Sequence, residues 1–159
     1  MKFLIKKGNH YHSNFWQRLN LFCFSKRLSY KVRFSDSCWY DKVNADSNDL
    51  NKLFGFGGRD HQVNSIRLCW RPDFLQKGVI QVYIYWYDDG ARSRKWFCDV
   101  DTNKFYIFTI QKNVNGFRIS MTGRDDYIEH SKPNPTWKRL WPYFGGNNTA
   151  PHDMIIELI

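Results

Sequence analysis

The chain has 159 residues, 24 lysines and arginines against 15 aspartates and glutamates, and an aromatic content of 18%. This length excludes an array of several domains, and we expect residues 1–159 to form a single β-sandwich domain. No run approaches the roughly 20 apolar residues that a membrane-spanning helix needs, and the first residues lack the apolar region and cleavage site of a signal peptide. We therefore expect no membrane partner, and a location in the cytoplasm or in a virion.

The formal net charge of +9 is concentrated in the first 35 residues, which hold eight basic residues and no acidic one. The other residues hold 16 basic and 15 acidic residues, which gives a net charge of only +1 there. An acid-free basic segment attracts a glycan or an acidic protein surface, and the attraction weakens with salt. The residues that we expect to bind such a partner are Lys26, Arg27, Lys31 and Arg33. The alternative is that this segment only keeps the protein in solution.

In chain order, alternating apolar and polar residues predict strands at 2–6, 19–24, 29–34, 65–71, 104–110, 117–121, 127–130 and 154–159. The polar segment 41–51 predicts an exposed loop, and the glycines of LFGFGG that follow it indicate a bend or a bulge. The pair Asn115-Gly116 indicates a turn between two of these strands. Short strands at this spacing favour an all-β, two-sheet antiparallel sandwich.

The segment 78–100 predicts a long hairpin, because Asp89-Gly90 between two alternating runs favours a type I′ turn. This turn pairs Tyr87 with Arg92, Tyr85 with Arg94 and Tyr83 with Trp96. Side chains alternate along a strand. One face then carries Tyr83, Tyr85, Tyr87, Arg92, Arg94 and Trp96, which we predict to be accessible, and the other carries Ile80, Val82, Ile84, Trp86 and Phe97, which we predict to be buried.

The last third of the chain supports a jelly roll. Residues 105–123, FYIFTIQKNVNGFRISMTG, resemble the paired strands of concanavalin A-like lectins and glucanases. Residues 139–159, RLWPYFGGNNTAPHDMIIELI, resemble the glycine-rich approach and terminal strand that close a sheet in that superfamily. The resemblance implies a jelly-roll β-sandwich with a concave sheet that often binds glycans.

Two enzymatic activities on polysaccharides, hydrolysis and lyase cleavage, need different catalytic side chains. Glycosidases need two carboxyl groups roughly 5 to 10 Å apart, but the only glutamates are Glu129 and Glu157, and neither has a second carboxylate at a suitable spacing. A polysaccharide lyase needs an Arg or Gln, a His and a Tyr. Residues 59–64, RDHQVN, supply these types together with Tyr83 or Tyr85 and Arg94. A lyase therefore stays open as an alternative.

No metal or cofactor is expected. His10 and His12 lack a third ligand nearby, residues 99–103 start like a calcium loop but lack its later ligands, and Asp41, Asp46 and Asp49 suit turns. Cys23, Cys38, Cys69 and Cys98 lie in no metal-binding spacing, so we expect reduced thiols, with Cys69 and Cys98 packed as small apolar residues.

The sequence favours a non-catalytic glycan-binding module, for which the ligand, a neutral or an anionic glycan, lies on the Tyr, Trp and Arg face of the hairpin. A structural or decoration protein of a phage virion, acting through protein contacts in a larger homo- or hetero-assembly, is the main alternative. Nucleic-acid binding is a weaker one. It rests on Phe15, Trp16, Phe22, Phe24 and Tyr30 among basic residues, although their alternation also suits a core.

Overall fold

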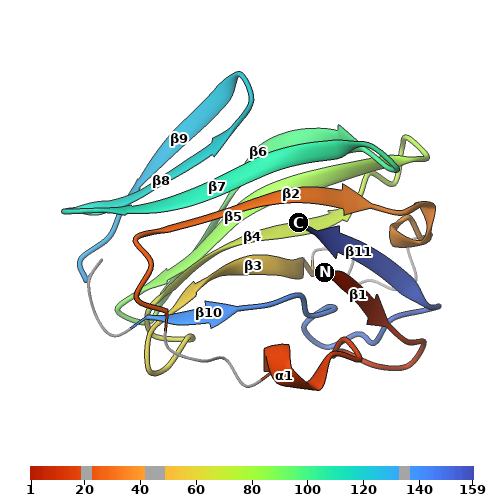
Figure 1. Cartoon of the computed structure of the whole chain (residues 1–159), viewed down its shortest axis with the longest axis horizontal. Helices are drawn as coiled ribbons and strands as arrows, with labels where there is room; N and C mark the ends of the chain where they lie inside the picture. Colours follow the sequence, from red (N-terminus) through yellow and green to blue (C-terminus); the bar gives the residue numbers. More distant parts are fainter. Residues whose placement is uncertain (19–22, 42–48, 133–136) are drawn as a thin grey trace.

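The computed structural model describes residues 1–18, 23–41, 49–132 and 137–159, and these fold into two antiparallel sheets that face each other (Figure 1). The expectation of an all-β, two-sheet sandwich is confirmed. The larger sheet contains, in spatial order, β1 (Lys2–Ile5), β11 (Met154–Leu158), β2 (Arg27–Phe34), β7 (Phe105–Asn113), β8 (Gly116–Met121) and β9 (Arg124–Glu129). The first and last strands are paired, so both ends of the chain lie in this sheet.

The smaller sheet contains, in spatial order, β10 (Lys138–Leu140), β3 (Asn51–Gly57), β4 (Ser65–Pro72), β5 (Val79–Asp88) and β6 (Ala91–Asp101). The two helical segments are one turn each: α1 (Phe15–Arg18) and the 3₁₀ helix η1 (Asp36–Cys38). Figure 1 shows α1 at the lower edge of the sandwich, on the side of β10 and β1. No helix in the described ranges is long and apolar enough to cross a membrane.

The core lies between the sheets and is largely aromatic, which accounts for the high aromatic content of the chain. Trp70 of β4 is fully buried, and its ring lies 5.3 Å from that of Phe34 on β2 in the opposite sheet. Phe56 of β3 and Phe117 of β8 pack together in the same way, with ring centroids 6.3 Å apart. Apolar residues alternate along the strands, so one face of each sheet supplies this core and the other face stays free for polar residues.

The hairpin has the expected register. β5 and β6 pair Tyr83 with Trp96, Tyr85 with Arg94 and Tyr87 with Arg92, and the turn residues Asp89 and Gly90 have φ angles of 50° and 85°. Ile80, Val82 and Ile84 are fully buried, and Trp86 is partly buried against the core. The tyrosines are half-buried on the outer face, and Arg92, Arg94 and Trp96 are exposed. A bulge beside Val82 places the consecutive residues Phe97 and Cys98 in the core.

Other expectations need correction. Residues 19–22 and 42–48, which cover most of one expected strand and of the expected loop, lie outside the described residues, and Cys23 and Phe24 belong to no strand. The bend or bulge expected at LFGFGG is a register shift at its first residue, Leu53, between Lys52 and Phe54, and its glycines 55 and 57 lie in the end of β3. Core positions for Phe15, Trp16 and Phe24 are wrong, because these side chains are exposed. All four cysteines are free and buried.

Candidate functional site

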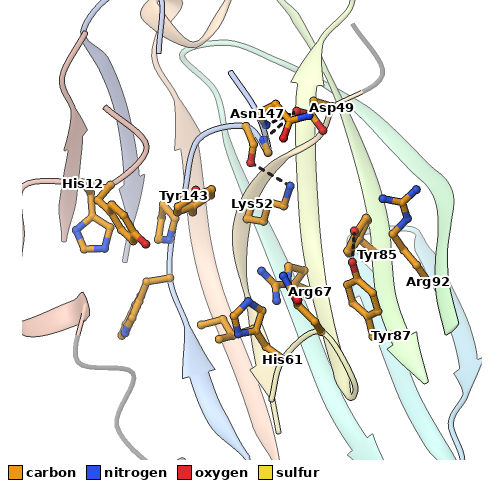
Figure 2. A pocket seen from close by; sticks show the side chains of 17 residues that line it. His12, Asp49, Lys52, His61, Arg67, Tyr85, Tyr87, Arg92, Tyr143 and Asn147 are labelled. Atoms are coloured by element: carbon orange, nitrogen blue, oxygen red, sulfur yellow. Dashed lines mark hydrogen bonds between the residues drawn. The ribbon is translucent and has the colours of Figure 1, made fainter. Parts of the chain in front are cut away.

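A pocket with a cavity volume of about 530 Å³ opens on the outer face of the five-stranded sheet (Figure 2). Strand alternation supplies its floor and one side. Its lining residues on the sheet are Lys52 of β3, Arg67 of β4, Tyr85 and Tyr87 of β5, and Arg92 of β6. Cross-strand pairing places Arg67 next to Tyr85 and Tyr87 next to Arg92.

The opposite side of the pocket comes from segments far away in the sequence. Tyr11 and His12, and several residues between Leu140 and Asn147, line it. An isolated bridge joins Tyr11 to Tyr143 and another joins Tyr143 to Lys52, so this side is attached to the edge of the sheet. The Tyr11 and Tyr143 rings pack edge to face with centroids 5.0 Å apart. Figure 2 shows His12 and Tyr143 across the pocket from Tyr85, Tyr87 and Arg92.

Arg67 is the most unusual residue of the pocket, because its side chain is a charged group that is only 8% exposed. Burial lowers the pKa of its guanidinium from the ordinary value. Its Nε has no hydrogen-bond partner. None of the ion pairs in the described part of the chain includes it. A buried cation without a carboxylate costs free energy, so the pocket holds a site that suits an anion.

Lys52 and Asp49 fix the upper end of the pocket in Figure 2. The Lys52 ammonium donates to the carbonyl oxygens of Leu50 at 2.6 Å and Gly145 at 3.1 Å. Burial lowers the pKa of this lysine. The Asp49 carboxylate accepts the backbone N–H groups of Gly146 at 3.0 Å and Asn147 at 2.9 Å. These bonds hold the loop against β3 and occupy one oxygen of Asp49, the one carboxylate among the described lining residues.

Tyr85 and His61 of the pocket also have shifted pKa values. The Tyr85 hydroxyl donates to the Tyr87 hydroxyl at 3.2 Å, and burial together with this bond raises the pKa of Tyr85. Burial, and then the nearby Arg67, lowers the pKa of His61. At neutral pH Tyr85 is therefore a proton donor and His61 is a neutral imidazole that can accept a proton.

The predicted ligand-binding residues divide into two groups. Tyr85, Tyr87 and Arg92 line the pocket, whereas Tyr83, Arg94 and Trp96 share its sheet face but lie outside it. The Tyr83 hydroxyl donates to Gln81 at 3.1 Å, and the Trp96 indole donates to Asp99 at 2.9 Å. Among the residues considered for a lyase, His61, Gln62 and Tyr85 line the pocket and Arg59 does not.

Sequence reasoning missed the role of Lys52, of Arg67 and of the 140–147 segment. A signal for Arg67 was present, because it alternates with the apolar residues of β4 and so had to lie on the outer face. The sequence does not show that Arg67 lies beside Tyr85, because this pairing depends on the register between β4 and β5. The 140–147 segment carries no comparable pattern.

The predicted partner-binding cations lie elsewhere. Lys31 and Arg33 are on β2, on the outer face of the six-stranded sheet and therefore on the other side of the sandwich from the pocket. Arg33 forms an ion pair of 2.6 Å with Glu157, and the Lys31 ammonium lies 4.7 Å from the centre of the Phe105 ring. Lys26 and Arg27 are exposed. Partner binding by these four residues stays a prediction.

Metal-binding types of side chain do not gather in the described ranges, where no group of three or more His, Cys, Asp or Glu residues could hold an ion. His10 is instead hydrogen-bonded to the Phe144 carbonyl at 2.9 Å, and Asp101 pairs with Lys104 at 2.7 Å. Glu157 lies on the opposite sheet from the pocket. The described lining thus lacks the second carboxylate that glycoside hydrolysis requires.

Comparisons with solved structures identify the architecture. An alginate lyase from Alteromonas sp. 272 matches with a TM-score of 0.52 and 10% identity over 84% of this chain and 68% of that one. The chain has a concanavalin A-like jelly-roll fold. Alginate lyase A1-II′ gives a TM-score of 0.55 and 11% identity over 83% of this chain and 58% of that one. A glycoside hydrolase family 16 endo-glucanase from Bacteroides ovatus gives a TM-score of 0.51 and 9% identity over 99% of this chain and 80% of that one.

At such low identity these likenesses concern the fold alone. No protein-family model and no curated protein matches the chain. The likenesses lend no support to a virion role or to a larger assembly. The activity therefore has to be argued from the pocket.

Proposed function

We propose that the protein binds an acidic polysaccharide in the pocket on the five-stranded sheet. The observation that carries this proposal is Arg67, a buried guanidinium that lines the pocket and forms no ion pair among the described residues. A guanidinium matches a carboxylate or sulfate group in shape and charge, and such a pair is strong where water is excluded. An acidic sugar would supply the charge that Arg67 lacks.

The rest of the pocket fits the same ligand. The described lining sets the cations Lys52, Arg67 and Arg92 against one carboxylate, Asp49, whose Oδ2 already accepts two backbone N–H groups. Tyr85 and Tyr87 on one side and Tyr143 on the other present aromatic rings, which pack against the apolar faces of sugars. Two of the similar structures are named as alginate lyases, so this fold accommodates enzymes of that name elsewhere.

A direct binding experiment tests the proposal. We expect alginate and polygalacturonate to slow the protein in affinity gel electrophoresis and to bind in titration calorimetry. A neutral glucan and a carboxyl-reduced alginate of equal length are the matched controls and should bind at least about tenfold more weakly. The difference should shrink with added salt. Equal binding of the acidic and carboxyl-reduced chains would contradict the proposal.

A second candidate function is β-elimination at the same site, favoured by the presence of His61, whose pKa burial lowers, and of the protonated Tyr85 in the lining of one pocket with Arg67. Arg67 would neutralise the uronate carboxylate, and neutral His61 would take the proton from the adjacent ring carbon. The electron pair left on that carbon forms a carbon–carbon double bond, the bond to the glycosidic oxygen breaks, and Tyr85 gives that oxygen a proton. The reaction needs no oxidant, metal or water.

Lyase activity has a specific readout, because the unsaturated product absorbs ultraviolet light and the intact polymer does not. If the protein is a lyase, this absorbance rises with time, and Tyr85→Phe stops the rise while polymer binding persists. If it is a binding module, the absorbance stays flat while binding is retained. Both outcomes are compatible with the acidic ligand.

His61 gives the binding a pH dependence. A bound polyanion favours the charged imidazolium, so its pKa is higher in the complex than in the free pocket, where burial lowers it. Protons are therefore taken up on binding. The affinity for alginate should rise as the pH falls from about 7.5 towards about 5, where uronate carboxylates are still ionised. Calorimetry across this range checks the trend, and His61→Gln should flatten it. An affinity that falls on acidification contradicts the assigned role of His61.

A further inference from the structure

Two exposed aromatic residues lie on the short helix α1, three and four residues along the chain from His12 of the pocket wall. Trp16 is 75% exposed and Phe15 is 62% exposed, and their rings pack edge to face with centroids 5.8 Å apart. These side chains add nothing to the core, and exposed aromatic surface of this kind marks binding sites more often than a single apolar residue does. We call this pair the α1 platform.

The α1 platform is joined to the wall of the pocket. Tyr11 and His12 line the pocket, and the chain from His12 to Trp16 spans at most about 14 Å. The intervening residues are held in place, since the Ser13 N–H donates to the Leu4 carbonyl at 2.8 Å and the Asn14 side chain donates to the Lys2 carbonyl at 3.0 Å. In Figure 2, His12 lies on the side of the pocket away from Arg92. A polymer that leaves the pocket on this side reaches the platform within a few sugar residues.

We propose that the α1 platform is a second binding site for the same acidic polysaccharide, and that it holds the part of the polymer that extends past Tyr11. This inference rests on the proposed function of the pocket. Charge supports the same occupant, because residues 1–18, the segment that ends in α1, contain four basic residues and no acidic one. Aromatic rings stack on sugars in this setting, while the surrounding cations attract the acid groups. Two linked sites on one chain increase avidity without any change in the pocket.

Ligand length separates the two sites in an experiment. Trp16→Ala should weaken binding of long alginate by about tenfold and leave binding of an alginate tetrasaccharide within about twofold of wild type. Trp16 is exposed, so this variant should keep its fold. Tyr127→Ala is the control, because Tyr127 is an exposed aromatic on β9 of the six-stranded sheet. It should bind both ligands as the wild type does. Quenching of Trp16 fluorescence by the long polymer, but not by the tetrasaccharide, is a second readout.

Each result has a clear meaning. If Trp16→Ala binds long alginate like the wild type, the platform proposal fails while the pocket proposal stands. If the wild type binds neither ligand, the pocket proposal fails and the platform proposal falls with it. If Trp16→Ala instead weakens binding to anionic vesicles or to single-stranded nucleic acid, and not to alginate, the platform belongs to that other partner and the proposal is overturned.

Discussion

Replacing Arg67 with methionine should remove most of the binding of acidic polysaccharide while leaving the fold as stable as the wild type, or more stable. The affinity for alginate should fall by about 30-fold to several hundred-fold, because the loss of a buried charge partner costs roughly 2–4 kcal/mol. The free energy of unfolding should stay constant or rise by about 1 kcal/mol, since methionine fills similar space without a buried charge. Calorimetry and urea denaturation measure the two quantities.

The two opposite effects separate a binding role from a structural one. Arg94→Met is the matched control, because Arg94 lies across from Tyr85 on the same face but outside the pocket and is exposed. It should change affinity and stability only slightly. Arg67→Lys keeps the charge but loses the planar pair of donors, so its affinity should lie between those of wild type and Arg67→Met. If Arg67→Met lowers the free energy of unfolding and still binds alginate like the wild type, the role of Arg67 is structural.

The sequence predicted the sandwich and the hairpin because both depend on local rules. Asp89-Gly90 favours one turn type, the turn determines the register, and the register places Tyr85 opposite Arg94. Tyr85, Tyr87 and Arg92 therefore lie on the outer face as expected, and there they line the pocket. Tyr83 and Trp96 followed the same rule onto the same face, but alternation does not say where along a strand a pocket lies.

The remainder of the site depends on contacts between distant segments. Tyr143 pairs with Tyr11 and Lys52 through isolated bridges that have no pattern in the sequence. The Lys52 ammonium also donates to the carbonyl of Gly145, two residues after Tyr143. Phe15 and Trp16 show the opposite error. Their spacing suited a core, but the chain turns into α1 there and leaves both rings exposed. Local alternation cannot decide between these outcomes, because burial depends on which segment covers the residue.

Gly55 lies on β3 directly beside Arg67 of the pocket. Replacing it with alanine should lower the free energy of unfolding by about 2–3 kcal/mol. A Cβ atom at Gly55 would lie 2.1 Å from the Ile66 carbonyl oxygen and 2.5 Å from the Arg67 Cα. Both obstacles are backbone atoms of β4, so the strand itself has to move. The midpoint of urea denaturation should fall accordingly, and alginate binding should weaken in the fraction that remains folded, because the moving backbone carries Arg67.

Gly57→Ala is the matched control for this prediction, since Gly57 lies two residues further along β3 on the same face. Its added Cβ would lie 3.0 and 3.1 Å from the two Leu140 methyl groups, which are the ends of a flexible side chain, and 3.2 Å from the His61 Cβ, a milder contact. We expect a cost below about 1 kcal/mol, because a rotation of Leu140 relieves the contact. If both variants lose the same stability, glycine is needed throughout the end of β3. If Gly55→Ala alone does, the glycine is required by the close approach of the β4 backbone at Arg67.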